Sequence, residues 1–230
     1  MRNICLDLNY LRHNEKIPED GADRIATSML PKLVLASASP SRRGLLERSG
    51  LPVQVIVSGV DEEDSRYADL SASEMVVALA IVKAHTVRKL IDYPALIIAC
   101  DSTFEFNGES LGKPVTRENA ISRAKQLSGN SGVLYTGHCL IDTEKEMEIS
   151  DVVATKVHFA KLRPAEIEAY VDTGEPLNVA GGFTLDGISA PFINRIEGET
   201  SNVIGLSLPW LRSAISSLGY NWFDFVTAKK

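Results

Sequence analysis

The order of apolar and polar positions divides the chain into short strands and helices that follow one another throughout. Apolar or alternating runs predict strands over 33–36, 52–57, 95–100, 133–142, 152–159, 181–187 and 191–196. A period near 3.6 residues predicts helices after Pro40 and over 72–91, 117–127, 164–171 and 208–218. The pair Asn107-Gly108 predicts a tight hairpin. Because strands and helices intermix without a repeat, the sequence predicts an α/β fold with a mixed, twisted sheet flanked by helices.

The run Ala95–Cys100 is apolar without interruption, as is typical of a strand buried on both faces. We expect this strand to end at Asp101, which would place the carboxylate at the edge of the sheet where open α/β sheets bind ligands. Burial there would raise the pKa of Asp101, whereas a metal or a lysine would lower it. The alternative is that Asp101 caps the following turn.

The segment 33–46 reads LVLASASPSRRGLL and has the pattern of an anion-binding turn. Ser39 is a good helix N-cap, and Pro40 suits the first helical position. The free amides and the dipole of such a helix start attract phosphate or carboxylate. Arg42 and Arg43 are unfavourable for the dipole in a first turn. A bound polyanion explains them; a solvated arginine face is the alternative.

Charged residues follow in a loop, a helix and a turn. The loop 58–64 is strongly acidic, and its Asp61 and Glu62 could ligate a hard cation such as Mg²⁺, although an acidic surface loop is the alternative. Lys83 falls within the helix over 72–91. Lys113 lies in a Gly-Lys-Pro turn, where it offers a mobile ammonium group, or one that is simply solvated.

The composition excludes several classes of protein. The chain has 230 residues and a net charge of −6, so it has no broad basic footprint for nucleic acid. Its three cysteines lack the spacing of a disulfide framework or a zinc site. No apolar run reaches membrane-spanning length, and no signal-peptide core precedes the first strand. We therefore expect a cytoplasmic protein without nucleic-acid or membrane partners, and a homodimer is possible. We expect residues 1–30 to form a disordered extension, 31–220 the domain and 221–230 a tail.

Taken in order, these motifs resemble the Maf family of nucleoside triphosphate pyrophosphatases, which are related in fold to inosine triphosphatase. The resemblance covers about 32–218 and rests on LASASPSRR (35–43), SGVDEE (58–63), LAIVKA (79–84), ACDS (99–102), LGKP (111–114), YTGH (135–138), AYVDTGEPLNVAGGF (169–183) and SNVIGLSLPWL (201–211). It implies a two-lobed fold with a central nucleotide-binding cleft.

The resemblance also implies a reaction and a set of roles. A nucleoside triphosphate would be cleaved to a monophosphate and pyrophosphate, with Asp101 accepting a proton from the attacking water. Glu62 and Asp101 would hold a divalent cation, Mg²⁺ or Mn²⁺. The triphosphate would be bound by Ser37, Ser39, Arg42, Lys83 and Lys113.

Three positions tune the choice of base in the family, and here they are Ser41, Ser102 and Asp186. This set matches neither the relatives that favour dTTP and UTP nor those that favour 7-methyl-GTP. An acidic Asp186 could accept hydrogen bonds from a guanine-type base, so we expect a purine or modified base. The alternative is that Asp186 only serves a β-turn before Gly187.

A second functional class is a nucleotide-binding regulator, because Maf proteins are also linked to arrest of septum formation. The presence of Asp101, Glu62 and Lys113 together favours catalysis. A comparison of pyrophosphate release by the wild-type chain and Asp101→Asn would separate the two classes.

Overall fold

The computed structural model describes residues 30–62 and 64–227, and the expected extension therefore lies almost wholly outside the described residues. The strands are β1 (Lys32–Leu35), β2 (Gln54–Val55), β3 (Ala95–Phe106), β4 (Glu109–Leu111), β5 (Ser131–Asp142), β6 (Met147–Phe159) and β7 (Ile193–Glu197). The α-helices are α1 (Pro40–Arg48), α2 (Ala72–Arg88), α3 (Arg117–Leu127), α4 (Pro164–Asp172), α5 (Thr200–Ile204), α6 (Leu208–Ser217) and α7 (Trp222–Phe225). Short 3₁₀ helices are η1 (Ser65–Tyr67), η2 (Glu175–Asn178), η3 (Ala180–Gly182) and η4 (Ala190–Phe192).

These strands form one mixed sheet in the order β2-β1-β3-β5-β6-β7, with β4 paired to β3. Strands β1, β2 and β3 are parallel, and the pairs β3–β5, β5–β6 and β6–β7 are antiparallel. The predicted hairpin joins β3 to β4 through Asn107-Gly108, both with positive φ. The predicted mixed α/β class is confirmed.

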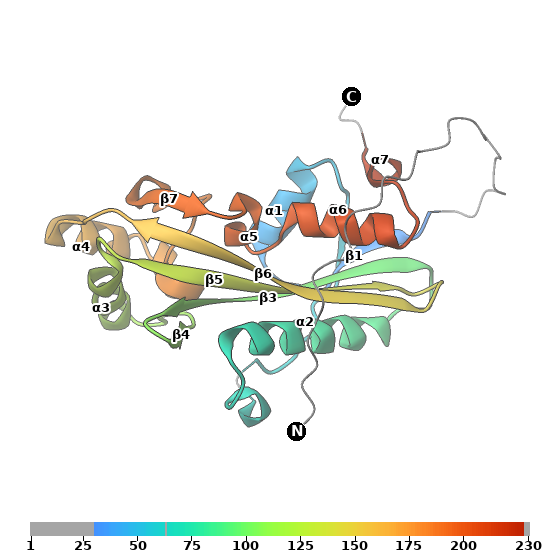
Figure 1. Cartoon of the computed structure of the whole chain (residues 1–230), viewed down its shortest axis with the longest axis horizontal. Helices are drawn as coiled ribbons and strands as arrows, with labels where there is room; N and C mark the ends of the chain where they lie inside the picture. The colour runs from blue at the N-terminus through green and yellow to red at the C-terminus, as the bar shows by residue number, and fades with distance from the viewer. Residues whose placement is uncertain (1–29, 63, 228–230) are drawn as a thin grey trace, which may run out of the picture.

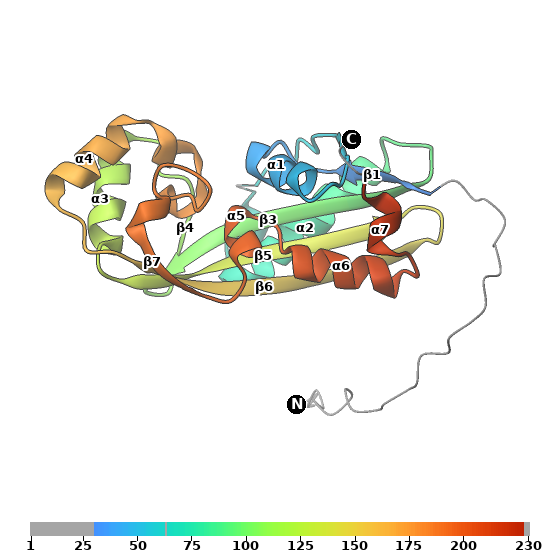
Figure 2. The ribbon, with the colours of Figure 1, turned by 90° about the horizontal axis from the view of Figure 1, so that it is seen from above.

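Helices cover both faces of the sheet, and a second group of helices gathers at one end (Figures 1 and 2). Helix α2 packs on one face, where β3 contributes Ile97 and Ala99 to an apolar cluster with Ala80 and Ala84. On the other face, Ile98 and Cys100 belong to the cluster that contains residues of α1, α6 and α7. Helices α3 and α4 lie beyond β4 at the end where β3, β5 and β6 extend past β1. Alternate residues of β3 thus face different layers.

Helix α2 approaches the sheet most closely at Gly137 of β5. A Cβ atom added there would lie 2.2 Å from the backbone of Val76, closer than atoms can pack. Gly137 is the register partner of Asp101 on β3. Glycine at this position therefore lets α2, which carries Lys83, come down onto the sheet beside Asp101.

The structure corrects three expectations of local structure. Strand β3 does not end at Asp101 but continues to Phe106, because β5 pairs with it along its whole polar half. The expected strand over 181–187 is wrong, since the segment consists of turns and part of η3 around Gly181 and Gly182 with positive φ. Only Gln54–Val55 pairs as a strand within 52–57.

The expected C-terminal tail is in part a helix that belongs to the fold. Helix α7 begins at Trp222 with a capping box between Asn221 and Asp224. Its Phe225 is buried in the cluster on the α6 face. The domain therefore extends past residue 220 among the described residues.

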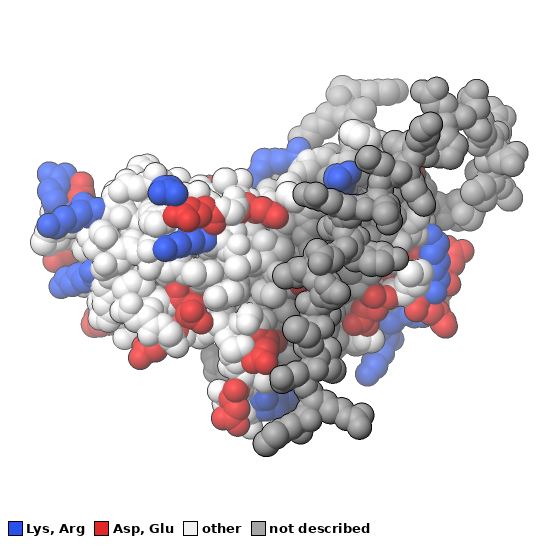
Figure 3. Space-filling model, viewed as in Figure 1, with Lys and Arg blue, Asp and Glu red and all other residues white. Residues whose placement is uncertain are grey.

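Charged side chains of both signs are interspersed on the face of the molecule shown in Figure 3. Among the described residues, no helix is long and apolar enough to cross a membrane. The absence of nucleic-acid and membrane partners stays a prediction.

Candidate active site

A cavity opens where the edge of β3 loses its strand partners. Strand β1 pairs with β3 only as far as Ile98, where the amide of Ala36 donates to the Ile98 carbonyl. Strand β4 joins the same edge from Phe104 onward. Among the described strands, 99–103 are unpaired on this side, and a cavity of about 430 Å³ lies there. Its walls include all ten residues expected at the site: Ser37, Ser39, Ser41, Arg42, Glu62, Lys83, Asp101, Ser102, Lys113 and Asp186.

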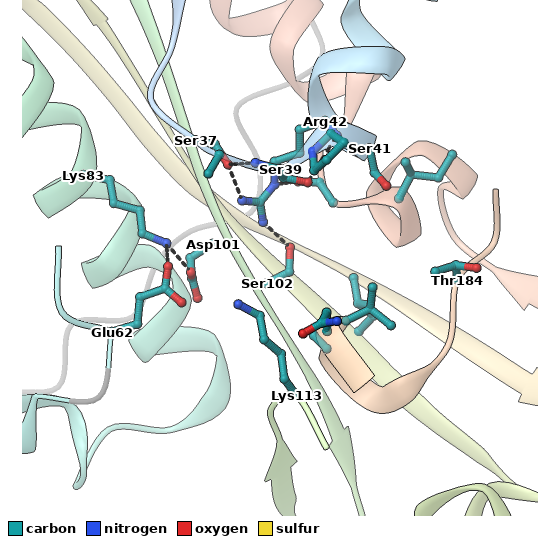
Figure 4. Close-up of a pocket in the computed structure, with 18 of the residues that line it drawn as sticks. Ser37, Ser39, Ser41, Arg42, Glu62, Lys83, Asp101, Ser102, Lys113 and Thr184 are labelled. Atoms are coloured by element: carbon teal, nitrogen blue, oxygen red, sulfur yellow. Dashed lines mark hydrogen bonds and ion pairs between the residues drawn. The ribbon is translucent and has the colours of Figure 1, made fainter. Parts of the chain in front are cut away.

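Lys83 joins the two acidic residues of the site (Figure 4). Its Nζ atom donates to Asp101 Oδ1 at 2.6 Å and to Glu62 Oε1 at 2.5 Å. Lys83 and Asp101 are buried, whereas the Glu62 side chain is 48% exposed. The second oxygen of each carboxylate makes no hydrogen bond or ion pair with the described residues.

Burial and charge act in opposite directions on the two carboxylates. Burial raises the pKa of Asp101, and the neighbouring charges of Lys83 and Arg42 only partly offset this effect. Burial also acts to raise the pKa of Glu62. The hydrogen bond from Lys83 and the charges of Lys83, Lys113 and Arg42 outweigh it, so the pKa of Glu62 lies below its ordinary value. At neutral pH this arrangement favours an ionised Glu62 beside a more basic Asp101.

The turn before α1 has the predicted form. Ser39 caps the helix by accepting from the amide of Arg42, and Pro40 occupies the first helical position. Ser37 accepts from the amide of Ser39, which closes the turn. Ser37, Ser39 and Ser41 all line the cavity, so the N-terminus of α1 points its dipole toward it.

Arg42 does not project into the cavity as a free cation. Its Nε donates to the Gly205 carbonyl at 2.7 Å, and Nη1 donates to Ser37 Oγ and to the Cys100 carbonyl. Its Nη2 donates to Ser102 Oγ at 2.9 Å. Four of the five guanidinium hydrogens are thus engaged within the protein. Arg42 connects the α1 turn, β3 and the end of α5, and its expected role as a triphosphate ligand stays a prediction.

The wall opposite the acidic pair is apolar and comes from three separate segments. Leu134 of β5 lines it together with Val203 and Ile204 of α5 and the turn residues Phe183 and Leu185. Phe104, Phe183 and Val203 pack in one cluster, which ties this wall to β3. Asp186 lies at the rim, where its carboxylate is 3.9 Å from Arg48 of α1. Uncharged and planar ligand groups fit such a wall.

Glu175 holds the turn that carries Asp186. Its carboxylate accepts from the amides of Ile188 and Ser189 and from the hydroxyls of Thr184 and Tyr170. Burial acts to raise the pKa of Glu175, but these hydrogen bonds outweigh it and the pKa is lowered. Glu175 was not among the residues expected at the site. The glycines Gly181, Gly182 and Gly187 indicate a tight turn in the segment that Glu175 holds.

Lys113 reaches the cavity from a strained turn. The following Val115 has φ of 65°, a conformation that β-branched residues rarely adopt. The amide of Thr116 donates to the Pro114 carbonyl, and the amide of Val115 donates to Leu177. Asn119 and Arg123 of α3 also donate to the backbone of this turn. These bonds hold Lys113, which is exposed, at the mouth of the cavity.

The acidic pair fits a cation that also binds the ligand. Within residues 30–62 and 64–227, no three His, Cys, Asp or Glu side chains gather as a metal site. Two carboxylates, each with one uncommitted oxygen, suit Mg²⁺, which takes few protein ligands and completes its shell with water and phosphate oxygens. Glu62 and Asp101 are the residues that could hold it.

Two residues of the site were missed by sequence reasoning. Thr136 of β5 and Asn202 of α5 are fully buried behind Ser102. The Thr136 hydroxyl is hydrogen bonded to Ser102 and to the carbonyl of Asn202. Both lie within motifs that the sequence analysis quotes, YTGH and SNVIGL, but polar residues in strands and short helices carry no local signal of their partners. His138, by contrast, lies behind the wall, where its Nε2 accepts from the amide of Ser207.

The fold and the cavity define an α/β protein with a charged cavity at an open sheet edge. A family model described as Maf-like protein matches residues 32–218, and the chain belongs to this family. A relative from Salinispora tropica is 48% identical over 81% of this chain and 84% of its own length. Another from Streptomyces coelicolor is 49% identical over 82% of this chain and 91% of its own length. Both are named nucleoside triphosphate pyrophosphatase.

A solved structure of a nucleoside-triphosphatase (dITP/XTP pyrophosphatase) from Mycobacterium abscessus aligns with 86% of this chain and 100% of its own. The identity is 13% and the TM-score is 0.36.

Proposed function

We propose that this chain hydrolyses nucleoside triphosphates to a nucleoside monophosphate and pyrophosphate. The observation that carries the proposal is the buried Asp101–Lys83 pair, which opens with Glu62 into a cavity of about 430 Å³. Membership in the Maf family and relatives named nucleoside triphosphate pyrophosphatase support the same reaction.

In the proposed reaction, a water oxygen attacks the α-phosphorus, and the bond to the bridging oxygen breaks as pyrophosphate leaves. Asp101 accepts the proton of the water, a role that a carboxylate of raised pKa performs well near neutral pH. Lys83 keeps Asp101 oriented, and Lys113 balances charge on the departing pyrophosphate. A divalent cation held by Glu62 and Asp101 would supply charge neutralisation for the phosphates.

Asp101→Asn tests the proposal directly. We expect pyrophosphate release in the presence of Mg²⁺ to fall by roughly 10²–10⁴-fold, the usual contribution of a general base. Asp92→Asn, on an exposed residue before the same strand, is the matched control and should retain wild-type turnover. Undiminished pyrophosphate release by Asp101→Asn would refute the assigned role.

Glu62→Gln tests the proposed cation site. The variant should need a higher concentration of Mg²⁺ or Mn²⁺ for half-maximal activity, because one of two carboxylate ligands is lost. An unchanged metal titration, with activity insensitive to a chelator, would contradict the site. Direct binding of Mn²⁺ followed by its paramagnetic signal gives the same comparison without turnover.

We propose that the base is a purine or a modified base, including non-standard ones. Asp186 at the rim of the apolar wall is the supporting observation, since a carboxylate accepts hydrogen bonds from N–H groups of a base. Turnover measured over a panel of ordinary and modified triphosphates tests this preference. Much faster hydrolysis of dTTP and UTP than of any purine nucleotide would overturn it.

A further inference from the structure

Four groups behind the cavity form one continuous chain of hydrogen bonds. Arg42 Nη2 donates to Ser102 Oγ at 2.9 Å, and Ser102 Oγ lies 2.9 Å from Thr136 Oγ1. Thr136 Oγ1 donates to the carbonyl of Asn202 at 3.2 Å. Ser102 and Thr136 are register partners on β3 and β5, so the middle of the chain is built into the sheet.

The two ends of the chain fix the direction of its two outer bonds. A guanidinium can only donate, and a backbone carbonyl can only accept. The hydroxyl of Thr136 has one hydrogen, and we assign it to the Asn202 carbonyl, which also accepts from the amide of Gly205. Thr136 must therefore accept from Ser102, whose own hydrogen is used in that bond.

Ser102 consequently offers a lone pair to a ligand and no hydrogen. One of its two lone pairs accepts from Arg42, and the other is left on a hydroxyl that lines the cavity. Figure 4 shows the Ser102 side chain in the cavity with the Arg42 bond on one side.

Ser102 faces the apolar wall rather than the acidic pair. Successive side chains of a strand point to opposite faces, so Ser102 shares a face with Phe104 and not with Asp101. Phe104 packs with Leu134, Phe183 and Val203, the last three of which line the cavity. If the phosphates lie beside the acidic pair and the cation that it would hold, the group that reaches Ser102 is the nucleoside.

Asn202, at the end of the chain, is anchored by its side chain. Its side-chain Nδ2 donates to the Val153 carbonyl and to Thr155 Oγ1 of β6, at 3.1 and 3.0 Å. The residue is fully buried. These bonds hold α5 against the sheet and keep the Asn202 carbonyl in place as the acceptor for Thr136.

We propose that Thr136 is a positioning residue that makes Ser102 an obligate acceptor, so that the site selects bases with a ring N–H beside a carbonyl. Hypoxanthine, guanine and uracil carry this N–H, whereas adenine and cytosine present a ring nitrogen lone pair at the same place. A lone pair opposite a lone pair repels and leaves both groups without a hydrogen bond. The inference rests on the proposed function, and it concerns polarity rather than ring size.

The test is the ratio of kcat/KM for ITP over ATP, and for UTP over CTP, in variants of Thr136. The wild-type chain should favour the first nucleotide of each pair by roughly 10-fold, the effect of about one hydrogen bond. Thr136→Val frees the Ser102 hydrogen to turn into the cavity, and both ratios should fall toward 1. Thr136→Ser keeps the hydroxyl and should keep both ratios.

Thr103→Val is a matched control, because Thr103 is a buried threonine of β3 that follows Ser102 and points to the opposite face of the sheet. It should leave the ratios unchanged. If Thr136→Val does not fold, Ser102→Ala replaces it, and this variant should lose the discrimination as well. A folded Thr136→Val or Ser102→Ala protein with wild-type ratios would overturn the proposal, as would a wild-type preference for ATP over ITP.

Binding of the non-hydrolysable α,β-methylene analogues of ITP and ATP separates this proposal from the proposed function. A chain that hydrolyses no nucleotide contradicts the reaction. A preference for the ITP analogue that disappears in Thr136→Val still supports the role of Thr136. Equal binding of both analogues by the wild-type chain contradicts that role, whatever the turnover.

Discussion

The two faces of β3 at the cavity differ in how they satisfy buried polar groups. Around Asp101, an ammonium from α2 lies between two carboxylates, and charge compensates charge. Around Ser102, one residue further, a chain of directed hydrogen bonds connects an arginine to a carbonyl. Charge therefore satisfies the polar groups around Asp101, whereas the supply of hydroxyl hydrogens determines the hydrogen bonds around Ser102.

The difference indicates a division of labour along one strand. A charged cluster can exchange a proton or a cation without moving the backbone, as phosphoryl chemistry requires. A chain of hydrogen bonds that begins at an arginine and ends at a backbone carbonyl does not readily exchange a proton or bind a cation. Such a fixed arrangement suits discrimination between ligands. Because strand residues alternate between faces, adjacent positions can carry both tasks without mixing their environments.

Removing Lys83 should have the largest effect and should act on the charged face alone. In Lys83→Met, the buried Asp101 loses its partner, and we expect the free energy of unfolding at pH 7 to fall by about 3–5 kcal/mol. Lys83 now lowers the pKa of Asp101, so its loss should move the acidic limb of the kcat/KM profile to higher pH. Stability and the pH profile are both measured.

Lys89→Met, on an exposed lysine at the end of α2, is the control for Lys83→Met. It should change neither quantity. An acidic limb that stays in place in Lys83→Met would show that the two groups are not coupled as their 2.6 Å contact implies.

Gly137→Ala tests whether the charged face depends on the close approach of α2. The added Cβ would lie 2.2 Å from the Val76 backbone, and relief requires α2 to move away from β5. We expect a loss of about 3 kcal/mol, at the upper end for overpacking. Denaturant unfolding measures it. Gly44→Ala is the control, because the new Cβ there meets only the Arg48 side chain, and it should not destabilise the chain. Equal losses of stability in the two variants would contradict this explanation.

Acid should destabilise the face of the sheet that carries Ser102, through His138. Burial, with a contribution from the charge of Arg42, lowers the pKa of His138 to about 3. Between pH 6.5 and 3 the unfolded chain therefore binds a proton that the folded chain does not. Stability falls as the pH decreases through this window, by about 1.4 kcal/mol per pH unit.

His138→Gln keeps an acceptor for the Ser207 amide and removes the titration. Urea unfolding at several pH values should show a shallower loss of stability for this variant below pH 6.5. Parallel curves for the two proteins would mean that His138 titrates normally in the folded state.

Val115→Gly should have the smallest effect, outside both faces. Glycine relieves the strain at φ of 65° but adds freedom to the unfolded chain, so we expect stability within about 1 kcal/mol of wild type. The looser turn should raise KM for the triphosphate a few-fold through Lys113. Val115→Ala keeps the strain and should keep the wild-type KM. An increase in KM for Val115→Ala but not for Val115→Gly would contradict this explanation.

Local patterns predicted much of the fold, and the resemblance to the Maf family implied the membership of the site. The helices α2, α3, α4 and α6 were predicted to within a few residues, because caps such as Ser71 and Thr116 and apolar periodicity are local features. The predicted end of β3 at Asp101 and the predicted strand over 181–187 were wrong. Pairing with β5 extends β3 through polar residues, and the turns depend on Glu175, which lies outside their own segment.

By itself, the sequence determined that this chain forms a mixed α/β sheet, because hydrophobic period and capping are properties of neighbouring residues. The side chains that line the cavity were implied by the order of motifs that the chain shares with the Maf family. Only the tertiary structure decided what those side chains do there. Arg42 is engaged by Gly205, which is 163 residues away, and Ser102 is hydrogen bonded to Thr136, which in turn contacts the carbonyl of Asn202. Hydrogen-bond direction depends on which donors and acceptors meet in space, and separations of this kind leave no periodic trace in a sequence.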